Sequence, residues 1–208
     1  MKKIAFFVFL LAVSVAAGRA QESRQDISLS GAALIEPHVS SSTNVYLGAN
    51  TAYGALLSYR FMLTPSSAVE ANYGITYQNT FHFTINGYQN GVSVLTRTQE
   101  MSAAYVRTFH YRKFNPFLEG GPGSLIFLPI RNIGTSDIDV KKQTEIGGIY
   151  GAGIAYEISP SFDIRAEYRG LVVKVPNFGL SSANSGIDLA TNKWYNVNEP
   201  VIGVAYHF

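Results

Sequence analysis

The ten residues Val69–Gln78, VEANYGITYQ, decide the fold class of this chain. Apolar or aromatic side chains occupy every second position of the segment, and Glu, Asn, Gly, Thr and Gln fill the positions between them. Successive side chains of a β-strand point to opposite faces. The segment therefore predicts a strand with one apolar face and one face of small or polar residues.

The same alternation recurs at 145–158, 162–172 and 201–208, and no helical periodicity appears after residue 20. Less regular strands are expected at about 26–36, 49–62, 94–111 and 116–126. Together these segments predict an all-β chain of eight strands, an even number that places both chain ends on one side.

The connections between these strands alternate in length. Short turn signals fall at 64–67, 112–115 and 159–161, and long polar segments fall at about 37–48, 79–93, 127–143 and 175–196. Short turns at one end and long loops at the other are typical of a transmembrane β-barrel. The segment 79–93 contains Asn86-Gly87 and Asn90-Gly91, and it is a candidate hairpin that projects beyond the membrane. A soluble, lipocalin-like barrel is the alternative, but it needs a charged exterior, and only 14% of this chain is charged.

Residues 1–20 have the features of a cleavable signal peptide. Lys2 and Lys3 precede an apolar run at 4–15, and Gly18 and Ala20 supply the small residues of a cleavage site before Gln21. Cleavage after Ala17 and an uncleaved anchor are the weaker alternatives. The predicted organisation is a signal peptide at 1–20 and one barrel domain at 21–208. Such a chain is exported through the inner membrane, with a Sec-type signal, to the outer membrane of a bacterium.

The chain ends at Phe208 directly after an alternating strand, with Tyr206 and Val204 on the same face. This ending, together with the segment PFLEGGPG at 116–123, resembles small outer-membrane barrels of the OmpA, OmpX and opacity-protein type. The resemblance covers residues 24–208. It implies an eight-stranded antiparallel up-and-down transmembrane β-barrel, inserted by the barrel-assembly machinery, which reads the terminal strand. It also implies contacts with outer-membrane lipid and lipopolysaccharide.

Six charged residues share the polar face near the short-turn end of the predicted strands: Arg60, Glu70, Glu119, Arg165, Glu167 and Arg169. Facing one interior, three acids and three bases are expected to pair, because an isolated buried charge is costly. The network forms either a structural plug or the gate of a narrow channel. Glu100 and Glu145 are expected near the loop end, as a separate group.

Arg107 has the parity of the lipid-facing Tyr105 and Phe109. Two alternatives follow: the side chain extends to the headgroups, or a β-bulge turns it inward.

Aromatic residues in the predicted loops are candidates for surface interactions: Phe81, Phe83, Tyr88, Trp194 and Tyr195. We expect a non-enzymatic, structural or adhesin-like role through four extracellular loops, with an unknown surface ligand. A narrow porin and a lipid A-modifying enzyme that uses His38 or His82 are the alternatives.

The chain has no Cys, and its net charge of +2 with scattered basic residues gives no nucleic-acid patch. No cofactor and no metal site are expected, because Asp137 and Asp139 lack the spacing of a calcium loop.

Overall fold

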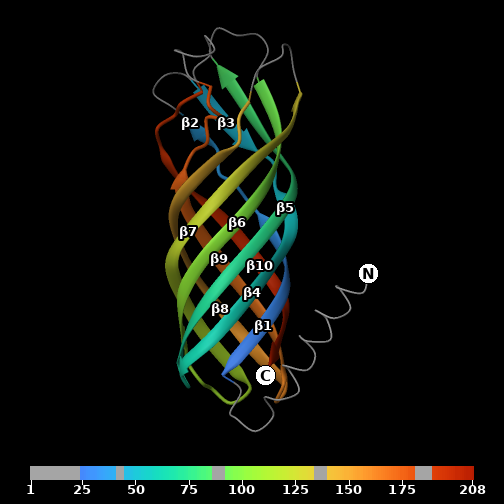
Figure 1. The fold of residues 1–208 in the computed structure, drawn as a ribbon, viewed down its shortest axis with the longest axis vertical. Helices are drawn as coiled ribbons and strands as arrows, with labels where there is room; N and C mark the ends of the chain where they lie inside the picture. Colours follow the sequence, from blue (N-terminus) through green and yellow to red (C-terminus); the bar gives the residue numbers. More distant parts are fainter. Residues whose placement is uncertain (1–23, 41–44, 86–91, 134–139, 181–188) are drawn as a thin grey trace, which may run out of the picture.

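The computed structural model describes residues 24–40, 45–85, 92–133, 140–180 and 189–208. Ten strands form one closed antiparallel sheet around a tall barrel (Figure 1). Their bounds are β1 (Gln25–Leu34), β2 (Val39–Ser40), β3 (Val45–Ala49), β4 (Ala52–Thr64), β5 (Ser67–Ile85), β6 (Val92–Thr108), β7 (Phe114–Ile133), β8 (Gln143–Ser159), β9 (Phe162–Lys174) and β10 (Trp194–His207). Within these residues no helix is long and apolar enough to cross a membrane.

The barrel has eight positions around its wall. β1 pairs with both β4 and β10, which closes the sheet between the first and last strands. β4 pairs with the lower part of β5, and β3 pairs with the part directly above it. β3 and β4 therefore share one position around the wall. The predicted eight-stranded closed antiparallel barrel is confirmed.

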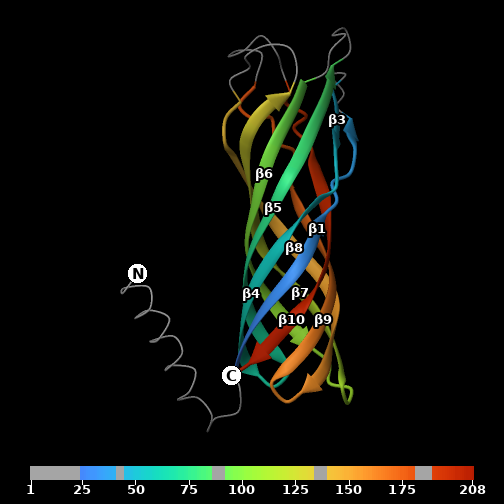
Figure 2. The same cartoon turned by 90° about the vertical axis from the view of Figure 1, so that its right-hand side faces the viewer.

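Strand lengths differ from the prediction at the loop end, opposite the two chain ends. The segment 79–93, a candidate hairpin beyond the membrane, extends two strands: β5 continues to Ile85, β6 begins at Val92, and the two pair as far as Phe83 and Val92. β7 continues to Ile133, and β10 begins at Trp194 (Figure 2). Phe81 and Phe83 continue the alternation of Val69–Tyr77, with Thr80 and His82 between them, but the Asn-Gly turn signals at 86–91 favoured a connection over longer strands.

The strand register fixes the tilt of the strands. A path along paired residues that starts at Gln25 goes once around the barrel and returns to the first strand at Ile35. The shear of the barrel is therefore ten residues. The path passes through Gln25, Phe61, Val69, Tyr105, Gly120, Tyr150, Gly170, Asn198 and Ile35. With about 3.3 Å per residue and about 4.8 Å between strands, this register gives a tilt of about 40°. Each residue then rises about 2.5 Å along the barrel axis.

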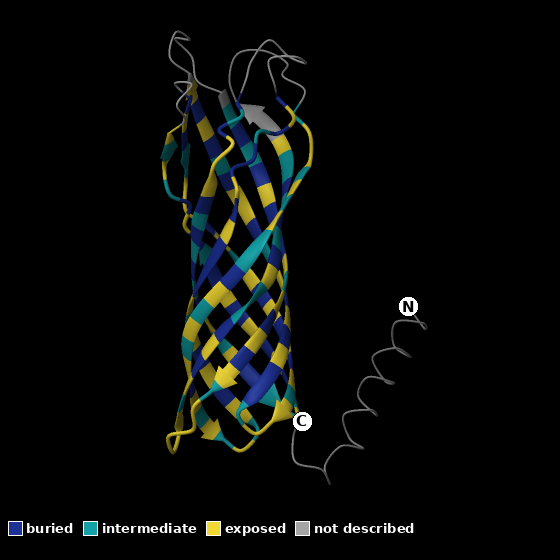
Figure 3. Cartoon of the chain, turned by 90° about the vertical axis from the view of Figure 1, so that its left-hand side faces the viewer, coloured by how far each residue is buried: buried dark blue, intermediate teal, exposed yellow. Residues whose placement is uncertain are grey.

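The exterior carries a continuous apolar band at the turn end. Residues alternate between buried and exposed along the strands (Figure 3). Apart from Arg107, the large exposed side chains in this part are aliphatic or aromatic. On the register above, the band rises about 25 Å from the level of Ile158 to the level of Ile75, the height expected of a lipid-facing band. Above it, polar outward residues such as Asn196 and Thr80 join exposed apolar ones such as Ile146.

The change in character coincides with a β-bulge in β5. Gln78 adopts a φ of 60°, and the pairing with β6 shifts between Thr76 and Asn79. The extra residue reverses the parity of the strand, so that Phe81 and Phe83 point inward. Below the bulge the barrel is apolar outside and polar inside, and above it this arrangement is inverted.

Candidate functional site

The lower lumen is filled by ion pairs between buried side chains. Arg60 pairs with Glu70 across β4 and β5 at 2.6 Å, and the guanidinium also lies 4.8 Å above the ring of Phe117. Arg165 on β9 pairs with Asp26 on β1 at 2.8 Å. All four charged side chains are at most 5% exposed, so each charge depends on its partner.

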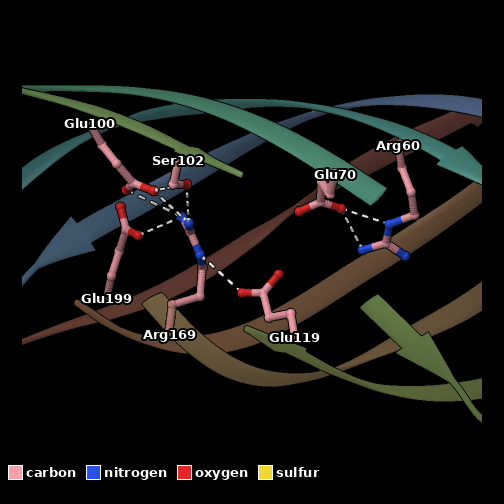
Figure 4. Close-up of polar contacts among 7 residues, drawn as sticks. All are labelled: Arg60, Glu70, Glu100, Ser102, Glu119, Arg169 and Glu199. Carbon is pink, nitrogen blue, oxygen red and sulfur yellow. Dashed lines mark hydrogen bonds and ion pairs between the residues drawn. The ribbon is translucent and has the colours of Figure 1, made fainter. Parts of the chain in front are cut away.

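Arg169 holds the centre of the lumen. Its guanidinium reaches from β9 to Glu119 on β7 at 3.1 Å, to Glu199 on β10 at 2.7 Å and to Glu100 on β6 at 2.5 Å (Figure 4). Ser102 accepts a further hydrogen bond at 3.2 Å. Because β6 lies three positions around the wall from β9, these contacts cross the interior.

The structure brings together only part of the predicted six-residue network, and Arg165 pairs instead with Asp26. The structure brings together Arg60 with Glu70, and Arg169 with Glu119, and it places Glu167 half-buried in the same lumen without an ion pair to any described residue. Sequence reasoning missed Asp26 and Glu199. Asp26 has inward parity at the first position of a predicted strand, and Glu199 shares the face of Val201 but precedes Pro200, before the predicted start of the last strand at 201.

Glu100 corrects the prediction of a separate group at the loop end. Its carboxylate binds Arg169 in the middle of the barrel, because strand tilt brings Glu100 on β6 and Arg169 on β9 to similar heights. Glu145 does remain apart from the lumen pairs and accepts a hydrogen bond from Gln143 at 2.5 Å.

Carboxylates outnumber cations in this lumen. Asp26, Glu70, Glu100, Glu119 and Glu199 are buried, with Glu167 half-buried, against the three arginines. Several buried polar atoms have no hydrogen-bond partner in the described structure, namely Asp26 Oδ1, Glu119 Oε2, both polar atoms of the Asn72 amide, and Nε and one Nη of Arg165. Such groups need water or counter-charges.

The upper lumen contains an aromatic cluster in place of charges. Phe81, Phe83 and Phe127 pack against Phe178, a residue of the segment that follows β9, with ring centroids 5.4–6.3 Å apart and edge-to-face geometry. All four rings are fully buried. The backbone N–H groups of Asn177 and Phe178 donate to Gln143 Oε1, which fixes this segment inside the mouth.

This cluster corrects the expectation of exposed loop aromatics. Phe81 and Phe83 are core residues, because the Gln78 bulge turns them inward. Tyr195 is also buried and donates its hydroxyl to Glu36. Trp194, in contrast, is 55% exposed, and Tyr88 lies outside the described residues.

Among the described residues, Glu36 is the one buried carboxylate above the apolar band. It follows Ile35, the partner of Asn198, and lies at the level of the outward Asn196, beyond the membrane-spanning part of the strands. Asn79 donates to it at 2.6 Å and Tyr195 at 3.2 Å. Burial without a cationic partner raises the pKa of the Glu36 carboxyl to about 7, and the two hydrogen bonds oppose that rise.

Comparison with known proteins agrees with this geometry. The model of the outer membrane protein beta-barrel domain matches residues 5–208. The chain belongs to this family of outer-membrane β-barrels. Neisserial surface protein A is similar in structure, with a TM-score of 0.56 and 16% identity, over 89% of this chain and 98% of that chain. OprG from Pseudomonas aeruginosa has a TM-score of 0.60 and 13% identity, over 90% of this chain and 97% of that chain. At these identities the likeness concerns the fold alone. No curated protein matches the sequence.

The terminal strand of this outer-membrane barrel has the expected surface. Val204 faces outward, and the ring of Tyr206 lies between those of Phe162 and Phe208. The role of Val204, Tyr206 and Phe208 as an assembly signal remains a prediction, as does signal-peptide cleavage, because residues 1–20 lie outside the described part.

Arg107 faces outward, which decides between the two sequence alternatives. It pairs with Ser67 without a register shift nearby, and its guanidinium donates to Ser67 Oγ at 2.9 Å. Tyr105 donates to the same oxygen at 2.8 Å. Arg107 therefore lies on the lipid-facing side near the turn end, with its charge held toward Ser67.

In the described part of the chain, no group of three or more His, Cys, Asp or Glu is placed to hold a metal ion. Asp137 and Asp139 lie outside that part. His82 on β5 contacts Ser93 on β6 at 2.8 Å on the outer surface, and His38 lies beside Gly48.

Proposed function

We propose that this outer-membrane barrel is a non-conducting protein that holds an extracellular surface for interaction with other molecules. The observation that carries the proposal is the inverted upper half, in which an apolar core fills the mouth of the barrel. A channel needs a continuous polar path. Here the ion pairs of Arg169 and the aromatic cluster around Phe178 block the lumen one above the other.

The upper half also gives the loops a firm base. β5, β6 and β7 continue beyond the apolar band, and their inner faces pack as in a soluble protein. Segments held on such a base lose less conformational entropy on binding than free loops do. The exposed Trp194 at the start of β10 supplies one aromatic contact of the kind that interfaces favour.

Single-channel recording in planar bilayers tests closure. We expect no steady conductance from protein purified from outer membranes. The positive control is a variant that combines Arg169→Ala with deletion of 177–190. It removes both obstructions, and the remaining excess of carboxylates should make its current cation-selective. Steady conductance by the unaltered protein would contradict the proposal.

Adherence tests the surface role. Cells that display the chain are compared with cells that display Trp194→Ala or a deletion of 181–188, on surfaces coated with collagen or mucin. We expect adherence to at least one coating, reduced in both variants, with an unchanged amount of folded protein at the surface. Equal adherence of all cells, including cells without the barrel, would refute the surface role.

The second candidate is a lipid A-modifying enzyme, favoured by the contact between His82 and Ser93. No described carboxylate contacts the imidazole to orient it, as a hydrolytic triad requires. Mass spectrometry of lipid A from cells with the native chain or with Ser93→Ala distinguishes the candidates. A mass change that depends on Ser93 would replace the proposal by the enzyme.

A further inference from the structure

We infer that the outer wall of the barrel carries two binding sites for the phosphate groups of lipid A, one at Lys174 and Trp194 and one at Arg97 and Tyr77. The inference does not rest on the proposed surface function. It concerns the outward face of β9 and β10 and the outward face of β5 and β6, which lie on different sides of the barrel.

Each site consists of one exposed cation fixed over an aromatic ring. Lys174 Nζ lies 5.6 Å from the ring centroid of Trp194, which is its partner across the β9–β10 ladder. Arg97 Cζ lies 5.0 Å from the ring centroid of Tyr77. A cation over a ring face is held in place by the ring quadrupole. A cation held in this way keeps its N–H donors free for a second partner.

Both cations lie at the same level of the wall. Strand register and tilt place Arg97 and Lys174 each about 26 Å above the level of Asp26, about 8 Å above Ile75 and just above the exposed Ile146. This level is the headgroup region, where Tyr and Trp also gather. At the loop end, that region belongs to the outer leaflet.

Neither cation has an anionic partner within the described residues, since no ion pair involves Arg97 or Lys174. The contrast with the lumen is plain, because each arginine there is paired with a carboxylate. Arg107, near the opposite end, donates to Ser67. Two unpaired cations beside rings at one level suit an anion that the membrane supplies at that level. Lipid A offers phosphates for the cations and sugar faces for the rings.

Trp194 makes the first site directly observable, because the chain has a single Trp. Folded protein in detergent micelles is titrated with diphosphoryl lipid A while Trp194 fluorescence is recorded. We expect a saturable change for the native chain. Lys174→Gln should weaken apparent affinity about fivefold, the effect of one cation near an anionic surface, and Lys174→Arg should restore it.

The matched control is Lys113→Gln, which removes an exposed lysine from the short turn at the opposite end. It should titrate as the native chain does. The Arg97 site is too distant for Trp194 to report, so lipid A that co-purifies with the protein is quantified by mass spectrometry. Arg97→Gln and Lys174→Gln should each reduce it, and the double variant should reduce it further.

Two results would overturn the inference. An equal response to phosphatidylglycerol would show a general anionic surface without preference for lipid A. An unchanged titration and unchanged co-purified lipid in the double variant would show that these cations bind no phosphate. Gel mobility of the unheated protein confirms that each variant is folded.

Discussion

At the scale of single residues, Arg169 holds the buried carboxylates of the lumen together. One guanidinium on β9 satisfies carboxylates from three other strands, and all of these side chains are at most 3% exposed. Removing one partner of a buried ion pair leaves the others unpaired in a medium of low dielectric.

Arg169→Gln should therefore lower the free energy of unfolding by about 3–5 kcal/mol. Urea unfolding of the barrel in lipid vesicles measures the loss. Arg169→Gln combined with Glu199→Gln should recover part of it, because one orphaned carboxylate is then neutral. Lys113→Gln, at an exposed turn, is the control for the loss of one positive charge. A midpoint equal to that of the native chain would mean that the network does not stabilise the fold.

Glu36 gives a prediction of pH dependence at the same scale. Its pKa is about 7 in the folded chain, against 4.5 as the ordinary value. The folded state thus holds a proton that the unfolded state releases between these values. The contribution of Glu36 to the free energy of unfolding is greatest below pH 4.5, falls as the pH rises to about 7, and is constant above that. The contribution amounts to roughly 3 kcal/mol.

Glu36→Gln should remove this dependence, since the amide stays neutral. Hydrogen exchange of the upper part of β10 at pH 5 and pH 8 measures it. We expect faster exchange at pH 8 in the native chain and equal protection at both pH values in the variant, after correction for the intrinsic rates. The same pH dependence in both proteins would assign it to another group.

At the scale of elements, the Gln78 bulge decides which side of β5 faces the interior. Gln78→Val places a β-branched residue where the bulge needs a φ of 60°. A regular strand without the bulge would turn Thr80 and His82 inward, and Phe81 and Phe83 outward. We expect the apolar core of the upper half to be lost while the lower barrel stays closed. Limited proteolysis should then cut the extracellular half, and the unheated protein should still migrate as a compact band. Gln78→Gly keeps the bulge and suits its positive φ, so this variant should resist the protease.

At the scale of the whole molecule, the level of the apolar band fixes the position in the membrane. Leu57 faces outward near the middle of the band, whereas Thr144 faces outward above it. Leu57→Arg should cost about 2–4 kcal/mol and Thr144→Arg little, because the penalty for an outward cation depends on depth. Unfolding in vesicles compares the two variants. Equal costs would place the band elsewhere on the wall.

The sequence by itself determined the class of fold and its orientation. Alternation from Val69 to Tyr77 requires a strand with unlike faces, and unequal connections distinguish the two ends. Arg60, Glu70, Glu119, Arg165 and Arg169 could be placed inside from parity alone, because the side-chain period of a strand is fixed.

Only the tertiary structure decided which charged residues pair and which side chains fill the upper half of the barrel. Ion-pair partners depend on shear, which brings Glu100, Glu119 and Glu199 from three strands to one guanidinium. Beyond Gln78, the face on which each side chain of β5 lies depends on the positive φ of this one residue, and the alternation of the sequence does not reveal it. A local pattern records which face a side chain takes, while register and bulges, which are properties of paired strands, determine what it meets there.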